Sequence, residues 1–351
     1  MNEKGQNNRL ISFYRENRKV LLFTLRISIS LSLIAVLVTT QLKDFGLALD
    51  ILKSSHIGFL LLSFATHFVG LWITAERWRI LLRAQNIGLG MGTITLTVLI
   101  GFFFSNFLPT TIGGDVYRIY DSSKRAKIPV EKAASVILVE RFSGVVSAAT
   151  YAVVALFLGF TAIGEQSVII PIVIFFSVTI ILGFLLINPS LLRLDRLVQR
   201  IGFLNKIRER LRNIYHTLRG FKQTKPALVY ALLYSFAMQF MIILNYYLAA
   251  RALDIELGLI AFIFIVPVVA TIAMLPISIG GIGLRENSLV FIMVAMGVIN
   301  EKAAIFSLLI FAMFLILGLL GGIAYIIRPF FERRAEAQAE KQKEIKGEAG
   351  D

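Results

Sequence analysis

The chain has 351 residues, of which 57% are hydrophobic, and its mean hydropathy is +0.76. Soluble domains contain about 45–50% apolar residues, so this composition excludes a soluble protein of this length. The formal net charge of +14 leaves two interpretations open, a nucleic-acid partner or a basic surface beside a membrane. Because the chain has no Cys and only three scattered His, we expect no disulfide, no metal site and no cofactor.

Six apolar windows are long enough to cross the hydrocarbon core as helices, which takes about 20 residues. These windows are Val20–Leu42, His56–Ala75, Ala133–Phe160, Ser167–Ile187, Ala227–Ala250 and Ala303–Ile327. Two further apolar stretches, Thr93–Leu108 and Gly258–Leu275, each run into a Pro and a pair of Gly. The expected fold is all-α and polytopic, with about six full spans plus two re-entrant or broken helix hairpins, at 93–126 and 258–298.

The distribution of Lys and Arg predicts the orientation, since cytoplasmic loops carry an excess of basic residues. Most of the 36 Lys and Arg fall in alternate segments, namely 1–19, 76–92, 118–132, 188–226 and 328–351. Both termini are therefore expected on the cytoplasmic side of the cell membrane. The same rule predicts that the hairpin at 93–126 enters and leaves on that side.

One motif occurs twice in the chain. The pattern L-P-x-[ST]-I-G-G-x-x-x-R spans Leu108–Arg118 and Leu275–Arg285, each time at the end of an apolar segment. The predicted spans place the two copies in opposite orientations, and inverted repeats with broken helices are a transporter architecture. Pro ends a helix and paired Gly exposes the backbone, so the following helix start could offer N–H groups to an anion. The rival interpretation is that Pro and Gly only permit close helix packing.

The chain divides into five expected parts. A basic cytoplasmic N-terminus (1–19) precedes a first membrane half (20–187), and a second membrane half (227–328) precedes a charged tail (329–351) that is a frayed helix or disordered. Between the halves, 188–226 is predicted to be a basic amphipathic helix on the cytoplasmic membrane surface, with anionic lipids as partners. It has few aromatic residues for base stacking, so no nucleic-acid partner is expected.

Charged residues occur at places where a membrane protein rarely keeps them without a partner or a cavity. Asp115 lies in the first motif copy, and Glu286 directly follows the second. Glu140 and Arg141 lie inside a predicted span, and as helix neighbours they diverge by about 100°, which predicts separate partners. We expect Glu140 to meet Arg118 or Arg285, either at a substrate site or as a structural salt bridge.

Basic residues surround an aromatic one after the second span. Arg77, Trp78 and Arg79 are expected to form a surface for lipid headgroups, because Trp is typical of the membrane boundary and Arg can meet lipid phosphate. A direct role in substrate binding is the alternative.

Together these residues resemble the lysylphosphatidylglycerol synthase transmembrane family, also called flippase-like domain proteins, over about residues 20–328. The matching positions are Arg77-Trp78, Leu81-Leu82, Asn106, Leu108-Pro109, Gly113-Gly114-Asp115, Arg118, Glu140-Arg141, Gly144, Gly280-Gly281 and Arg285-Glu286. Members that make lysylphosphatidylglycerol carry a further soluble aminoacyl-transferase domain. The resemblance implies the translocation half of the activity, without the synthase.

The resulting hypothesis is a membrane transporter, not an enzyme, that moves a lipid with a phosphate-bearing, aminoacylated or glycosylated headgroup between leaflets. The alternative is an integral-membrane lipid-modifying transferase or its membrane subunit, with Asp115 or Glu140 as general base. A lipid-modifying synthase or a glycosyltransferase is an expected partner. The expected substrate-binding residues are Asn106, Pro109, Gly113, Gly114, Asp115, Arg118, Glu140, Arg141, Gly280, Gly281, Arg285 and Glu286.

Overall fold

The computed structural model describes residues 45–107, 113–157, 220–273 and 281–348, together with positions 28, 32, 35, 39, 177, 181 and 278. Within these ranges every regular element is helical. The elements are α2 (Phe45–Lys53), α3 (Ile57–Ala84), α4 (Met91–Phe107), α5 (Gly113–Ala126), α6 (Val130–Phe157), η2 (Phe221–Gln223), α10 (Lys225–Ala252), α11 (Leu259–Ala273), α12 (Leu284–Ala295) and α13 (Asn300–Glu348).

Four of these helices are long and apolar enough to cross a membrane: α3, α6, α10 and α13. They coincide with four of the six predicted spans. The other two predicted spans, at 20–42 and 167–187, and most of the predicted amphipathic helix at 188–226 lie outside the described residues. The apolar helices α4 and α11 are shorter, as expected for segments that break at Pro and Gly.

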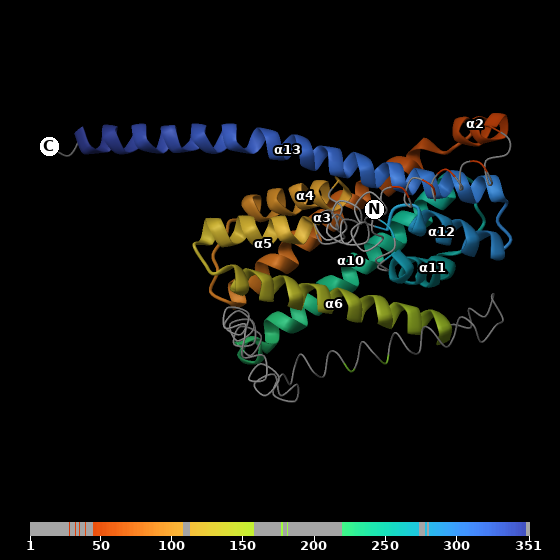
Figure 1. Ribbon diagram of the computed structural model, residues 1–351, viewed down its shortest axis with the longest axis horizontal. Helices are drawn as coiled ribbons and strands as arrows, with labels where there is room; N and C mark the ends of the chain where they lie inside the picture. The colour runs from red at the N-terminus through yellow and green to blue at the C-terminus, as the bar shows by residue number, and fades with distance from the viewer. Residues whose placement is uncertain are drawn as a thin grey trace, which may run out of the picture.

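Helices α3 and α10 pack side by side in opposite directions. Ser63, near the start of α3, hydrogen-bonds Asn245 near the end of α10, whereas Arg77, near the end of α3, hydrogen-bonds Ser235 near the start of α10. Close approach of the two helices is possible because a Cβ on Gly70 would already lie 3.1 Å from the Met238 sulfur. In Figure 1, α10 runs diagonally through the molecule, crossing α6 in this view and ending near α13.

Helix α4 forms an antiparallel hairpin with α5. Thr97, in the first half of α4, donates a hydrogen bond to Asp121 in the second half of α5, at 2.6 Å. Where the hairpin closes, a Cβ on Gly114 would lie 2.3 Å from both the Gly101 carbonyl oxygen and Ser105 Oγ. Glycine at position 114 is therefore required by close packing of the two helices.

The long helix α13 covers α4 and joins the two halves. A Cβ on Gly321 would lie 2.2 Å from the Leu99 carbonyl oxygen, and one on Gly318 would lie 2.5 Å from Asn106 Nδ2. The charged tail is helical as far as Glu348, and Figure 1 shows this end of α13 extending past the other helices. Two buried apolar clusters hold the molecule together, one mainly on α3, α4 and α6, the other mainly on α10, α11, α12 and α13, and α6 and α10 contribute residues to both.

Candidate functional site

The carboxylate of Glu140 lies at the meeting point of three helices. One oxygen accepts a hydrogen bond from Arg77 Nη2 of α3 at 2.7 Å, and the other accepts one from Arg118 Nη2 of α5 at 2.5 Å. Glu140 itself, on α6, is only 2% exposed. The expected contact with Arg118 is confirmed, while Arg285 belongs to a different cluster. Charge pairing of this kind is what allows ionised groups to remain in a buried position.

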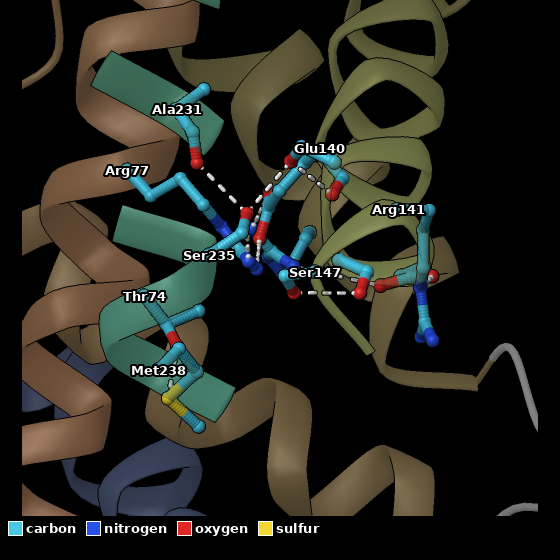
Figure 2. A network of polar contacts seen from close by, with 12 residues as sticks. Thr74, Arg77, Glu140, Arg141, Ser147, Ala231, Ser235 and Met238 are labelled. Carbon is cyan, nitrogen blue, oxygen red and sulfur yellow. Dashed lines mark hydrogen bonds and ion pairs between the residues drawn. The ribbon is translucent and has the colours of Figure 1, made fainter. Parts of the chain in front are cut away.

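A chain of hydroxyl groups extends the cluster to α10. Arg77 Nη1 donates to Ser235 Oγ at 3.0 Å, and Ser235 Oγ lies 2.9 Å from Ser143 Oγ. Figure 2 shows Arg77 of α3 and Ser235 of α10 converging on Glu140 of α6, while Arg141 points away from them. Four helices therefore share one polar network.

The residues after the second predicted span lie in the interior of the protein. Trp78 is 1% exposed, and the guanidinium of Arg118 stacks over its ring with 4.4 Å to the centroid. The Arg77 side chain is only 11% exposed. The expected lipid-headgroup surface is therefore wrong for Arg77 and Trp78. Helix α3 continues to Ala84 and carries these two residues into contact with α5 and α6. Arg79, which pairs with Glu76, retains more exposure.

Arg141 has its own partner, as expected from its angular separation from Glu140. Its Nε donates to Asp115 Oδ2 at 2.6 Å, and the other carboxylate oxygen of Asp115 lies 3.5 Å from Arg118 Nη1. Arg77, Arg118 and Arg141 thus share two carboxylates, which leaves one positive charge in excess. The excess lies toward Arg141, whose side chain is 54% exposed.

The second motif copy forms a more local arrangement. Gly281 (φ +79°) and Gly283 (φ +81°) occupy the left-handed region of backbone space, which favours glycine. Glu286 then accepts a hydrogen bond from the Gly283 N–H at 2.5 Å and pairs with Arg285 at 2.6 Å. The start of α12 was expected to offer free N–H groups to an anion. The carboxylate of Glu286 already takes one of them.

A small pocket lies between α4, the second motif copy and α13. It is lined by Ser105 and Asn106 of α4, Ile282 and Arg285 of the second copy, and Phe311, Phe314 and Leu315 of α13. Asn106 Nδ2 donates to the Phe314 carbonyl at 2.8 Å, and the Arg285 guanidinium stacks on the Phe314 ring at 4.5 Å. Ser105 also abuts Gly114, so the start of α5 lies behind one residue of the pocket wall.

Three expected site residues remain: Gly113, Pro109 and Gly280. Gly113, the first residue of α5, is buried beside Gly114. Pro109 and Gly280 lie outside the described residues. Within the described ranges, no group of three or more His, Asp or Glu is placed to hold a metal ion.

Comparison with known proteins agrees with these features. The family model described as the lysylphosphatidylglycerol synthase TM region matches residues 23–322. The chain belongs to this family. Among similar proteins, a UPF0104 membrane protein of Methanocaldococcus jannaschii is 23% identical over 277 residues, which cover 74% of this chain and 82% of the relative. Another UPF0104 membrane protein, from Pyrococcus horikoshii, is 24% identical over 301 residues, covering 78% and 88%. The protein is therefore a multi-pass membrane protein of this family.

A second polar cluster was missed from the sequence. Arg328 of α13 lies 3.2 Å from an Asp121 carboxylate oxygen and donates to Thr97 and Tyr117, also at 3.2 Å. Asp121 also accepts a hydrogen bond from Arg125 Nε. The available signal was the spacing on α5, because Asp121 lies on the same helix face as Arg118 and Arg125. No local pattern connects it with Arg328.

Proposed function

We propose that this family member moves a lipid with a phosphate-bearing, aminoacylated or glycosylated headgroup across the bilayer. The observation that carries the proposal is the small pocket between α4 and the second motif copy, which Asn106 and Arg285 from different predicted halves both line. In transporters built from inverted repeats, substrate sites form at the repeat interface from broken helices. The hairpin of α4 and α5, and the turn between α11 and α12, provide such breaks.

The residues that line this small pocket offer a headgroup both charge and hydrogen bonds. Arg285 supplies a guanidinium whose Nε and Nη2 are taken by Glu286, so Nη1 faces no acceptor among the described contacts. Ser105 adds a hydroxyl and Asn106 an amide oxygen. The aromatic residues on α13 supply an apolar wall against which the upper part of a lipid can pack.

The Glu140 cluster supplies a second set of charges for movement of the headgroup across the bilayer. Each of its three Arg contacts at least one of its two carboxylates, and one positive charge remains in excess. A headgroup phosphate binds beside the one positive charge that these residues leave in excess, so Asp115 and Glu140 keep their guanidinium partners. Neither carboxylate is then left unpaired, which would cost several kcal/mol for a buried ion.

The orientation proposed for this function follows the basic residues. Both termini lie on the cytoplasmic side of the cell membrane, the α4–α5 hairpin opens to that side, and the two halves have inverted topology. Two observations support this arrangement. The antiparallel α4 and α5 begin and end at the same end of the hairpin, and Lys or Arg residues cluster at 76–92 and 118–132.

The direct test is lipid movement in proteoliposomes. Purified protein is reconstituted with headgroup-labelled phosphatidylglycerol, aminoacylated phosphatidylglycerol or glycosyl diacylglycerol, and the label in the outer leaflet is followed by chemical quenching. Arg285→Ala is expected to slow movement of the transported lipid about tenfold or more, because a hydrogen bond to a charged group contributes roughly 1.5–3 kcal/mol. The matched control is Arg251→Ala, which removes an exposed Arg at the end of α10.

The same proteoliposomes test the alternative. A lipid-modifying transferase would convert the labelled lipid into a covalent product when the donor substrate is added, and mass spectrometry would detect it. Transbilayer movement of chemically unchanged lipid supports the transporter. An equal rate in empty liposomes, wild type and Arg285→Ala would refute it.

A further inference from the structure

One buried stripe of α10 connects the two charged clusters. Ser235, Gln239, Ile243 and Tyr246 recur at spacings of three and four residues, and all four are buried. Positions three or four apart lie on one helix face, so these side chains form a continuous line along the interior side of α10.

One end of this stripe bonds the Glu140 cluster, and the other end packs close to Glu286. Ser235 accepts a hydrogen bond from Arg77 Nη1, and Nη2 of the same guanidinium donates to Glu140. At the other end, Tyr246 packs edge-on against Phe306, with 5.9 Å between ring centroids. The next residue, Ser307, donates a hydrogen bond to the Glu286 carbonyl at 3.1 Å. The rise of 1.5 Å per residue separates the two ends by about 16 Å along α10, roughly half of a hydrocarbon core of about 30 Å.

Gln239 lies in the middle of this line with an unused donor. It is 8% exposed, and its Nε2 makes no hydrogen bond with any part of the chain that the structure describes. Buried polar groups in proteins nearly always have hydrogen-bond partners, and an exception calls for an explanation such as a missing water or ligand. An apolar residue of similar size would avoid the cost of burying the amide. Its neighbour along the stripe, Ser235, already hydrogen-bonds Arg77 and Ser143.

We propose that Gln239 is a contact for the lipid headgroup between the Glu140 cluster and the Arg285 pocket. This inference rests on the proposed function. The headgroup leaves one cluster and reaches the other by way of the Gln239 amide, which donates to a phosphate or ester oxygen and accepts from a headgroup hydroxyl or ammonium group. An amide suits this position because it carries no charge that would trap the headgroup halfway.

The first test separates this role from a structural one. Gln239→Met keeps the length and volume of the side chain but removes the amide. If the amide only fills space, the variant should transport normally and unfold at the same or a higher temperature, because an unpaired buried polar group is costly. If the amide contacts the headgroup, the variant should still be at least as stable, yet move lipid about tenfold more slowly, which corresponds to the loss of about one hydrogen bond in the barrier. Gln239→Asn, which keeps an amide on a shorter side chain, should restore part of the rate.

The second test uses the absence of Cys from the sequence. Gln239→Cys introduces a single thiol into an otherwise unreactive chain, and Leu233→Cys places one on the outer face of α10, where Leu233 is 57% exposed. In proteoliposomes, a small water-soluble thiosulfonate should modify the thiol at position 239, and the transported lipid should slow that modification about threefold or more at saturation. Modification at position 233 should not depend on the headgroup of the added lipid.

The outcomes separate the two proposals. Normal lipid movement by Gln239→Met, or modification at position 239 at a rate that no lipid changes, overturns the role of Gln239 and leaves the transporter intact. Failure of the wild-type protein to move any of the three lipids overturns the proposed function itself. If Gln239→Met does not fold, Gln239→Leu and the thiol protection experiment decide the question.

Discussion

The two copies of the repeated motif use the same residues in different ways. In the first copy, α5 begins directly at the Gly pair, and Arg118 reaches out to Glu140 on another helix. In the second, two left-handed glycines precede α12, and Arg285 pairs with the adjacent Glu286. The first copy therefore depends on α3 and α6 for its charge balance, whereas the second is largely self-contained.

This difference shows how one motif can serve two tasks. Charge pairing across helices fixes the first copy to the bundle, so its Arg can be released only when other helices move. The second copy keeps its ion pair and its helix cap within three residues, so its Arg can line a pocket without help from a distant partner. We expect three sets of variants to test this contrast, in order of decreasing effect.

Removing the shared carboxylate should have the largest effect. Glu140→Gln leaves Arg77 and Arg118 without a counter-charge in a buried place, and breaking a buried ion pair in this way costs about 3–5 kcal/mol of unfolding free energy. Glu286→Gln should cost less, because only Arg285 loses a counter-charge and the amide oxygen can still accept the Gly283 N–H. Reversible unfolding in mixed detergent micelles measures both. Equal losses would contradict the contrast between the copies.

Replacing the second glycine of each motif copy should lower stability by less than Glu140→Gln does, and by different amounts in the two copies. Gly114→Ala would bring a Cβ to 2.3 Å from backbone and side-chain atoms of α4, so we expect a loss of about 3 kcal/mol through forced separation of the hairpin. Gly281→Ala meets Ala273 less closely, at 2.9 Å, but must also adopt a left-handed conformation, which costs about 1–2 kcal/mol. The same unfolding assay should rank Gly114→Ala as the more damaging variant.

Exchanging the residues at one equivalent motif position should give the smallest loss of stability when Gly is placed in the first copy. Val116 and Gly283 occupy the same position of the motif, yet Val116 lies in a helix and is 59% exposed. Val116→Gly should therefore cost only about 0.5–1 kcal/mol, the usual penalty of Gly in a helix. Gly283→Val places a β-branched residue at φ +81° and should cost clearly more. A symmetric result would mean that the two turns are equivalent.

Much of the helical framework could be predicted from the sequence, because hydrophobic windows and helix breakers are local signals. Four spans and the breaks at both motif copies have the expected places. The separate partners of Glu140 and Arg141 followed from the geometry of a helix alone. The inverted relation of the two halves stays a prediction.

The contacts that assemble the site were harder to predict, because they join residues far apart in the chain. Arg77 and Trp78 end an apolar window, and hydropathy alone places such residues at the membrane surface. Their burial depends on Glu140 and Arg118, which compensate the charge and cover the ring. The sequence likewise does not predict the ion pair between Asp121 and Arg328, because it forms only when α13 packs along α4.

The position of Arg328 also has a mechanical consequence for α13. Pro329 follows it directly, and because Pro lacks an N–H, the helix loses one internal hydrogen bond there and bends most easily at this point. Arg328 anchors the inner part of the helix to Asp121 just before that hinge, on the side that also carries Phe314. The part of α13 after Pro329 can therefore change its direction by bending at the proline, while the part before it, which carries the wall of the pocket, keeps its position.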